Sequence, residues 1–137
     1  MNEQENTRIV QQAYENFKNG DIPALLDLYS DDIDWRLPEI ENVPWSGSRK
    51  GREETAELFQ SLAEAQDVLT FNPQEFIAKG DKVVVLGDYS WRVKATGREF
   101  GSEWAHVWTV KNGKLVGFQE YADTAATSKA HQKAAGA

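Results

Sequence analysis

The sequence predicts a single α+β domain in which a curved antiparallel sheet folds over three N-terminal helices. Two observations lead to this expectation. Apolar residues follow helical spacing through much of residues 7–65, whereas a period of two dominates from Val68 onward. A chain of 137 residues without internal repeats or a low-complexity linker suits one domain over residues 1–137. A sheet that curves over helices encloses a space where small-molecule pockets form.

Three helices are expected in the N-terminal half of the chain. The first covers residues 7–19 and ends at an Asn-Gly pair, which favours a left-handed stop. Asp21 caps the second helix, which is expected to end near residues 30–32. The third helix covers residues 51–65.

The strands are expected mainly in the C-terminal half. A short strand over 33–37 and a loop over 38–50 separate the second and third helices. Turn signals divide the remainder into four strands, at 68–78, 82–94, 99–111 and 114–121. The core therefore spans about residues 7–123, and residues 124–137 are expected to form a short helix, capped by Asp123, or a flexible tail.

Composition and charge exclude several classes of protein. Fifteen Lys and Arg against 22 Asp and Glu give a net charge of −7, which repels phosphate backbones, so no nucleic-acid partner is expected. The absence of cysteine excludes thiolate metal sites, and two histidines are too few for a multi-histidine centre, although a carboxylate-held magnesium stays open. The sequence also has neither an export signal nor an apolar run near the ~20 residues of a membrane span. We therefore expect a cytoplasmic protein with no metal and no membrane partner.

The last hairpin has two possible registers, which place different side chains in the interior. A two-residue Asn-Gly turn would set His106 opposite Gln119, so that Glu120 faces away. A three-residue loop would set His106 opposite Phe118 and make Glu120 its diagonal neighbour. We favour the three-residue loop because it gathers aromatic and aliphatic residues on one face, namely Trp104, His106, Trp108, Val110, Val116 and Phe118.

His106 and Glu120 are the candidate catalytic residues. Tryptophans around a carboxylate raise its pKa, and a nearby imidazolium lowers it again, so the pair can titrate near neutrality. A group poised there can move a proton at a carbon next to a carbonyl. The alternative is a buried pair that only satisfies its own hydrogen bonds.

Several short motifs, in this order and spacing, resemble the nuclear transport factor 2-like superfamily, and within it the SnoaL-like and ketosteroid-isomerase-like branch. They are Asn19-Gly20-Asp21-Ile22, Leu28-Tyr29-Ser30-Asp31-Asp32, Gly51-Arg52-Glu53 and Asn112-Gly113-Lys114-Leu115. The resemblance implies a cone-shaped sheet around a deep apolar pocket, and a homodimer. It implies less about activity, because fold does not determine function.

The resemblance argues against a standard ketosteroid isomerase. Its tyrosine position falls on Ala13, its proton-carrier position on Leu37 and its oxyanion acid on His106. Tyr14 and Glu39 lie one and two residues from those positions, and their roles stay open.

The polyketide-cyclase branch matches better. Those proteins carry a histidine on the penultimate strand and an acid on the last, here His106 and Glu120, with glutamate in place of the usual aspartate. This resemblance implies cofactor-free proton transfer on a hydrophobic carbonyl compound. Aromatic residues are expected to line the pocket, with core packing as the alternative for each: Tyr29, Trp35, Trp45, Phe59, Trp91, Trp104, Trp108 and Phe118.

Two functions therefore remain open. The first is a cofactor-free general acid–base enzyme of isomerase, cyclase or lyase type, whose partner is a hydrophobic small molecule. The second is a non-catalytic ligand-binding or dimerisation module of the same fold, with the outer face of the sheet as the interface.

Overall fold

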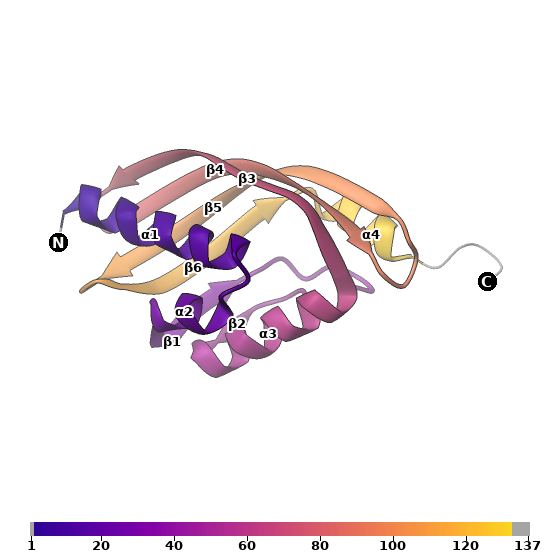
Figure 1. The fold of residues 1–137 in the computed structure, drawn as a ribbon, viewed down its shortest axis with the longest axis horizontal. Coiled ribbons are helices and arrows are strands. Elements are labelled where there is room, and N and C mark those ends of the chain that lie inside the picture. Colours follow the sequence, from indigo (N-terminus) through magenta and orange to yellow (C-terminus); the bar gives the residue numbers. More distant parts are fainter. Residues whose placement is uncertain (1, 133–137) are drawn as a thin grey trace.

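The computed structural model describes residues 2–132 and has an α+β fold (Figure 1). The elements follow in the order α1 (Glu3–Lys18), α2 (Ile22–Asp27), β1 (Tyr29–Arg36), β2 (Arg49–Lys50), α3 (Gly51–Ala65), β3 (Gln66–Lys79), β4 (Lys82–Val93), β5 (Glu99–Lys111), β6 (Lys114–Ala122) and α4 (Thr124–His131). The expected helices and strands are thus present in the expected order.

The six strands form one mixed sheet that does not close on itself, in the order β2-β1-β6-β5-β4-β3. Strands β3 to β6 form an antiparallel meander, but β1 pairs with β6 in parallel. The expectation of a wholly antiparallel sheet is therefore wrong at this pair. A parallel pair needs a long crossover connection, and the chain between β1 and β6 supplies one.

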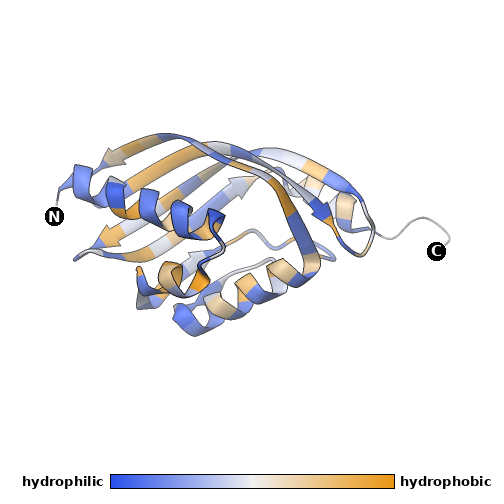
Figure 2. Cartoon of the chain, viewed as in Figure 1, coloured by the Kyte–Doolittle hydropathy of each residue, from blue (hydrophilic) through white to orange (hydrophobic). Residues whose placement is uncertain are grey.

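The helices lie on one side of the curved sheet. Helix α1 packs across β3 and β4, whereas α3 packs against β1 (Figure 1). Along the strands, hydrophobic and hydrophilic residues alternate (Figure 2). The hydrophobic set faces the helices and forms the core, because successive side chains of a strand point to opposite faces.

Some boundaries differ from the sequence-based expectation. Helix α1 begins four residues early because the Asn2 side chain accepts a hydrogen bond from the Glu5 backbone N–H and caps it. Helix α2 ends at Asp27, and Tyr29 already belongs to β1, where it pairs with Leu115 of β6. Pairing with a distant strand has overridden the local helical pattern there.

Strand β2 and helix α4 lie where the sequence predicts a loop and a short helix or flexible tail. The loop expected at 38–50 contains at its end the two-residue strand β2. Asp123 caps α4 as expected, through a hydrogen bond from the Ala126 N–H to its carboxylate. The part of the expected tail beyond residue 132 lies outside the described residues.

The β5–β6 hairpin has neither of the two expected registers. Its turn is the two-residue Asn112-Gly113, with positive φ angles of 51° and 77° that suit a type I′ turn, so the favoured three-residue loop is wrong. Lys111 then pairs with Lys114 and Val110 with Leu115.

A β-bulge next to this turn changes the register. Beyond the Val110–Leu115 pair, Thr109 pairs with Gly117, so Val116 is an extra residue on β6. The ladder is thereby shifted by one, and His106 lies directly opposite Glu120. The expectation that a two-residue turn would point Glu120 away from His106 is therefore also wrong. The bulge also places Leu115 in the core and leaves Val116 half-buried, the reverse of what we expected.

Within residues 2–132, no helix is long and apolar enough to cross a membrane. The same residues contain no group of three or more His, Asp or Glu side chains arranged to hold a metal ion.

Candidate active site

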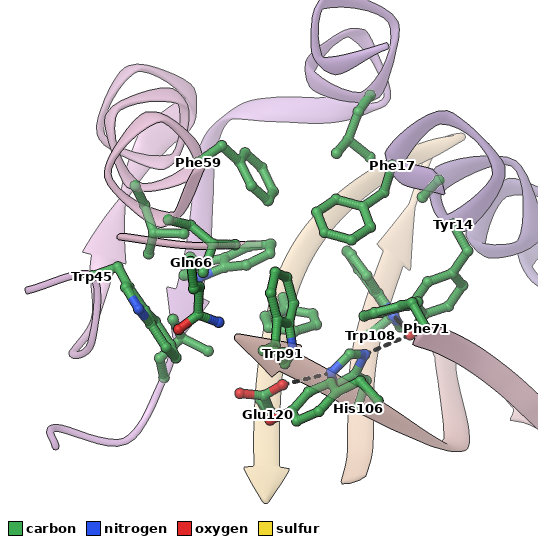
Figure 3. A pocket seen from close by; sticks show the side chains of 18 of the residues that line it. Tyr14, Phe17, Trp45, Phe59, Gln66, Phe71, Trp91, His106, Trp108 and Glu120 are labelled. Atoms are coloured by element: carbon green, nitrogen blue, oxygen red, sulfur yellow. Dashed lines mark hydrogen bonds and ion pairs between the residues drawn. The ribbon is translucent and has the colours of Figure 1, made fainter. Parts of the chain in front are cut away.

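A cavity of about 80 Å³ lies between the inner face of the sheet and helices α1, α2 and α3 (Figure 3). Its wall is almost wholly aromatic and aliphatic, and the few polar side chains in it are therefore the candidates for chemistry. The lining residues are Ala13, Tyr14, Phe17, Leu25, Tyr29, Trp35, Leu37, Trp45, Leu58, Phe59, Leu62, Gln66, Phe71, Tyr89, Trp91, Phe100, His106, Trp108, Phe118 and Glu120.

His106 and Glu120 meet in this wall. His106 Nε2 lies 3.0 Å from Glu120 Oε1, and the imidazole is buried whereas the carboxylate is partly exposed. The two strands hold them in place because the residues are directly paired across β5 and β6. The indole of Trp104 stacks on the imidazole with ring centroids 3.9 Å apart, and Phe118 packs edge-on against it with ring centroids 4.7 Å apart.

Tyr14 extends this pair into a hydrogen-bonded chain. Its hydroxyl lies 2.7 Å from His106 Nδ1, and the indole N–H of Trp108 donates to the same hydroxyl at 2.9 Å (Figure 3). Because the hydroxyl accepts from Trp108, its own proton can be donated to Nδ1. A neutral imidazole then carries its proton on Nε2 and donates it to Glu120.

Burial shifts the pKa values of the side chains around this hydrogen-bonded chain. It lowers the pKa of His106 below the ordinary value of 6.5, and the neighbouring Glu120 carboxylate offsets part of this shift. Burial also raises the pKa of Tyr14 far above its ordinary value. Tyr89, which also lines the cavity, has its pKa raised by burial and by the charge of Glu120. At neutral pH the site therefore holds a neutral imidazole and protonated tyrosines.

The sequence leaves the role of Tyr14 open, because this residue lies one position from the one that the resemblance aligns with the tyrosine of the isomerases. The structure brings it to the site, since Tyr14 and Ala13 are both buried on the inner side of α1 and both line the cavity. Leu37 lines the cavity as well, whereas Glu39 does not.

Seven of the eight aromatic residues expected in the pocket line the cavity, and Trp104 does not. Trp104 lies beneath the imidazole of His106, in the core. Trp108 is deeply buried and donates its N–H to Tyr14. Trp45 is buried in spite of its loop position and packs edge-on against His131 of α4, with ring centroids 6.2 Å apart.

The site lies within a recognised domain family. The model of the SnoaL-like domain matches residues 10–118, which is more than half of the chain. This chain belongs to the SnoaL-like domain family. The resemblance to the nuclear transport factor 2-like superfamily is thereby confirmed, and solved structures of that superfamily support it further.

Two of these solved structures cover nearly the whole SnoaL-like chain. An NTF2-like protein from Burkholderia xenovorans is 34% identical, with a TM-score of 0.87 over 96% of this chain and 99% of that one. An NTF2-like protein from Burkholderia thailandensis is 30% identical, with a TM-score of 0.84 over 93% of this chain and 98% of that one.

More distant structures share the fold and carry functional descriptions. A candidate SnoaL-like polyketide cyclase from Mesorhizobium loti is 23% identical, with a TM-score of 0.69 over 83% of this chain and 96% of that one. Candidate isomerases from Rhodopseudomonas palustris and Bacillus subtilis are 22% and 16% identical, with TM-scores of 0.66 and 0.80. No protein of curated function matches this chain.

Proposed function

We propose that this SnoaL-like protein is a cofactor-free general acid–base enzyme that acts on a small hydrophobic carbonyl compound. The observation that carries the proposal is the Glu120 carboxylate in an apolar cavity wall, 3.0 Å from a buried, neutral imidazole. The descriptions of distant relatives as candidate isomerases or a candidate polyketide cyclase agree with this class of chemistry.

In the proposed reaction, Glu120 removes a proton from the carbon next to the substrate carbonyl. The C–H electron pair becomes the new C=C bond of an enolate, and the carbonyl oxygen takes up the negative charge. Returning the proton to another carbon completes an isomerisation. Alternatively, the enolate carbon attacks a second carbonyl of the substrate and closes a ring, and the new alkoxide oxygen takes the proton back from Glu120.

His106 supports this step as the partner of Glu120. Its Nε2–H can donate to the carboxylate and hold it in one orientation, while Tyr14 and Trp108 hold the imidazole in the required tautomer. Both imidazole nitrogens are engaged in this way. The geometry therefore favours His106 as a positioning residue rather than as the donor to the substrate oxygen.

The size of the cavity limits the substrate to one ring at most, and even one ring requires side chains of the wall to shift. An engineered apolar cavity of about 150 Å³ binds benzene, and this cavity is smaller, at about 80 Å³. Among the aromatic residues that line the cavity, Trp45 lies in the irregular segment between β1 and β2.

The experiment that tests the proposal needs no knowledge of the natural substrate. Small ring ketones such as cyclopentanone are incubated with the protein in D₂O, and NMR follows deuterium incorporation next to the carbonyl. We expect the protein to accelerate exchange and Glu120→Gln to abolish the acceleration while the ketone still binds. Glu103→Gln, an exposed change on the same hairpin, is the matched control and should leave exchange unchanged. Unaltered exchange in Glu120→Gln would remove Glu120 from the mechanism.

The second candidate function, an assembly module, has its own supporting observation. Tyr121 is 54% exposed and Leu86 37% exposed on the outer face of the sheet, where a second copy could pack in a homodimer. In that case Glu120→Gln would lower stability and have no catalytic effect. Analytical ultracentrifugation of the protein and of Tyr121→Glu tests this interface, since a dimer held by this face should dissociate in the variant.

A further inference from the structure

Gln66 is a buried polar residue that the proton-transfer chain does not use. It is the first residue of β3, directly after α3, and its side chain lines the cavity although the residue is only 3% exposed. Its Oε1 has no hydrogen-bond partner among residues 2–132. In Figure 3 the side chain extends toward the part of the cavity where Glu120 lies.

A buried amide without a partner destabilises a fold, and buried polar groups are therefore nearly always paired. Asn16, buried on α1, follows that rule and accepts a hydrogen bond from Gln12 at 2.9 Å. Gln66 instead leaves its amide unpaired at the edge of the cavity, where a bound molecule could pair with it.

The proposed reaction also needs a hydrogen-bond donor to the carbonyl oxygen of the substrate. Charge develops on the carbonyl oxygen of the substrate, and enzymes of this kind stabilise it with a hydrogen-bond donor. His106 is engaged at both nitrogens, and the Tyr14 hydroxyl is engaged with His106 and Trp108. The donor must therefore be another group in the wall, either the amide of Gln66 or the indole N–H of Trp35 or Trp45, which also lack partners among residues 2–132. Gln66 is the candidate among them because its side chain extends toward Glu120 (Figure 3).

We propose that Gln66 binds the carbonyl oxygen of the substrate through its amide N–H and stabilises the enolate that Glu120 generates. This inference rests on the proposed function and deepens it, because it makes Gln66 the group that selects ketones over hydrocarbons of the same shape. Among the residues that the structure describes, none fixes the amide oxygen, so the amide can turn its NH₂ toward the ligand. The substrate class is then a compact ring ketone whose oxygen lies at Gln66 and whose neighbouring carbon lies at Glu120.

Binding of a matched pair of ligands tests Gln66 without any turnover. Cyclopentanone and methylenecyclopentane have nearly the same shape, but only the ketone can accept a hydrogen bond. We expect the wild-type protein to bind the ketone about tenfold more tightly in ligand-observed NMR titrations, as one buried hydrogen bond corresponds to roughly that ratio. Gln66→Met keeps the length of the side chain and removes the amide, and it should bring the two affinities together.

Two controls keep the result specific. Gln60→Met makes the same change at an exposed position of α3 and should retain the tenfold preference. Tyr29→Phe removes the hydroxyl of another buried residue of the wall and should retain it as well. Equal binding of the two ligands to the wild-type protein, binding of neither, or loss of the preference only in Tyr29→Phe would each overturn the assignment of Gln66.

The same ligands separate this inference from the proposed function. If cyclopentanone exchanges deuterium in a Glu120-dependent way but Gln66→Met retains the ketone preference and the full exchange rate, only the role of Gln66 is wrong. If the preference depends on Gln66 but no exchange occurs, Gln66 is a ketone-binding residue and the acid–base chemistry is wrong.

Discussion

The two faces of the β5–β6 hairpin alternate residue by residue and differ in what surrounds them. On the inner face, Trp104, His106 and Phe118 are almost fully buried, and the imidazole is held by aromatic rings and by Glu120. On the outer face, Glu103 and Tyr121 are exposed. Glu103 and Glu120 thus have the same chemistry and opposite surroundings.

The difference shows how one residue can decide the chemistry of a site. The extra residue of the bulge, Val116, brings Glu120 onto the inner face together with His106. In a regular ladder from the same two-residue turn, His106 would lie opposite Gln119, and Glu120 would point to the outer face as Glu103 does.

The largest expected effect of a substitution is on the inner face. Phe118 packs on Trp35 with ring centroids 3.9 Å apart and on Trp108 at 4.6 Å, so Phe118→Ala leaves a cavity among rings that cannot close it. We expect a loss of about 3–5 kcal/mol in the free energy of unfolding, measured by urea denaturation. A loss below about 1 kcal/mol would mean that the interior is loosely packed.

A smaller effect is expected at the end of the hydrogen-bonded chain. Tyr14→Phe removes the hydroxyl and leaves the Trp108 N–H and His106 Nδ1 buried without their partner. We expect a loss of about 1–3 kcal/mol in stability, together with slower deuterium exchange of ring ketones. A variant with full stability would show that the chain is not needed to satisfy these groups.

The pH dependence of stability tests the burial of His106. Its pKa is lowered in the folded state, so between pH 6.5 and that lower pKa the unfolded state binds more protons than the folded state. Stability should therefore fall as the pH drops below 6.5, with a slope from this residue of up to about 1.4 kcal/mol per pH unit. His106→Gln should reduce the slope in urea denaturation at pH 5.5 and 6.5. The same slope in both proteins would contradict the burial of His106 as a neutral group.

The smallest effect is expected on the outer face. Tyr121→Thr keeps a residue that favours strands and removes a ring that is already 54% exposed. We expect a change in stability within about 0.5 kcal/mol and full exchange activity. A loss of stability comparable to that of Phe118→Ala, at a protein concentration where the chain is monomeric, would show that the two faces of the hairpin contribute equally to the free energy of unfolding.

In the β5–β6 hairpin, the turn can be predicted from the sequence but the bulge cannot. The sequence signals an Asn-Gly turn, but a bulge at Val116 leaves little trace in a strand where Leu115 and Val116 are both apolar. We therefore placed His106 and Glu120 on one face for the wrong reason, through a three-residue loop. Their direct pairing depends on the ladder that β6 forms with β5 on one side and β1 on the other.

The sequence by itself determined the α+β class, the order of the elements, the family resemblance and most of the aromatic wall, because periodicity and capping are local properties. The tertiary structure alone decided the parallel pairing of β1, the bulge, and the meeting of Tyr14 and Gln66 with the His106–Glu120 wall. Those features depend on contacts between residues far apart in the chain. A hydroxyl on α1 reaches an imidazole on β5 only once the sheet has curved over the helix.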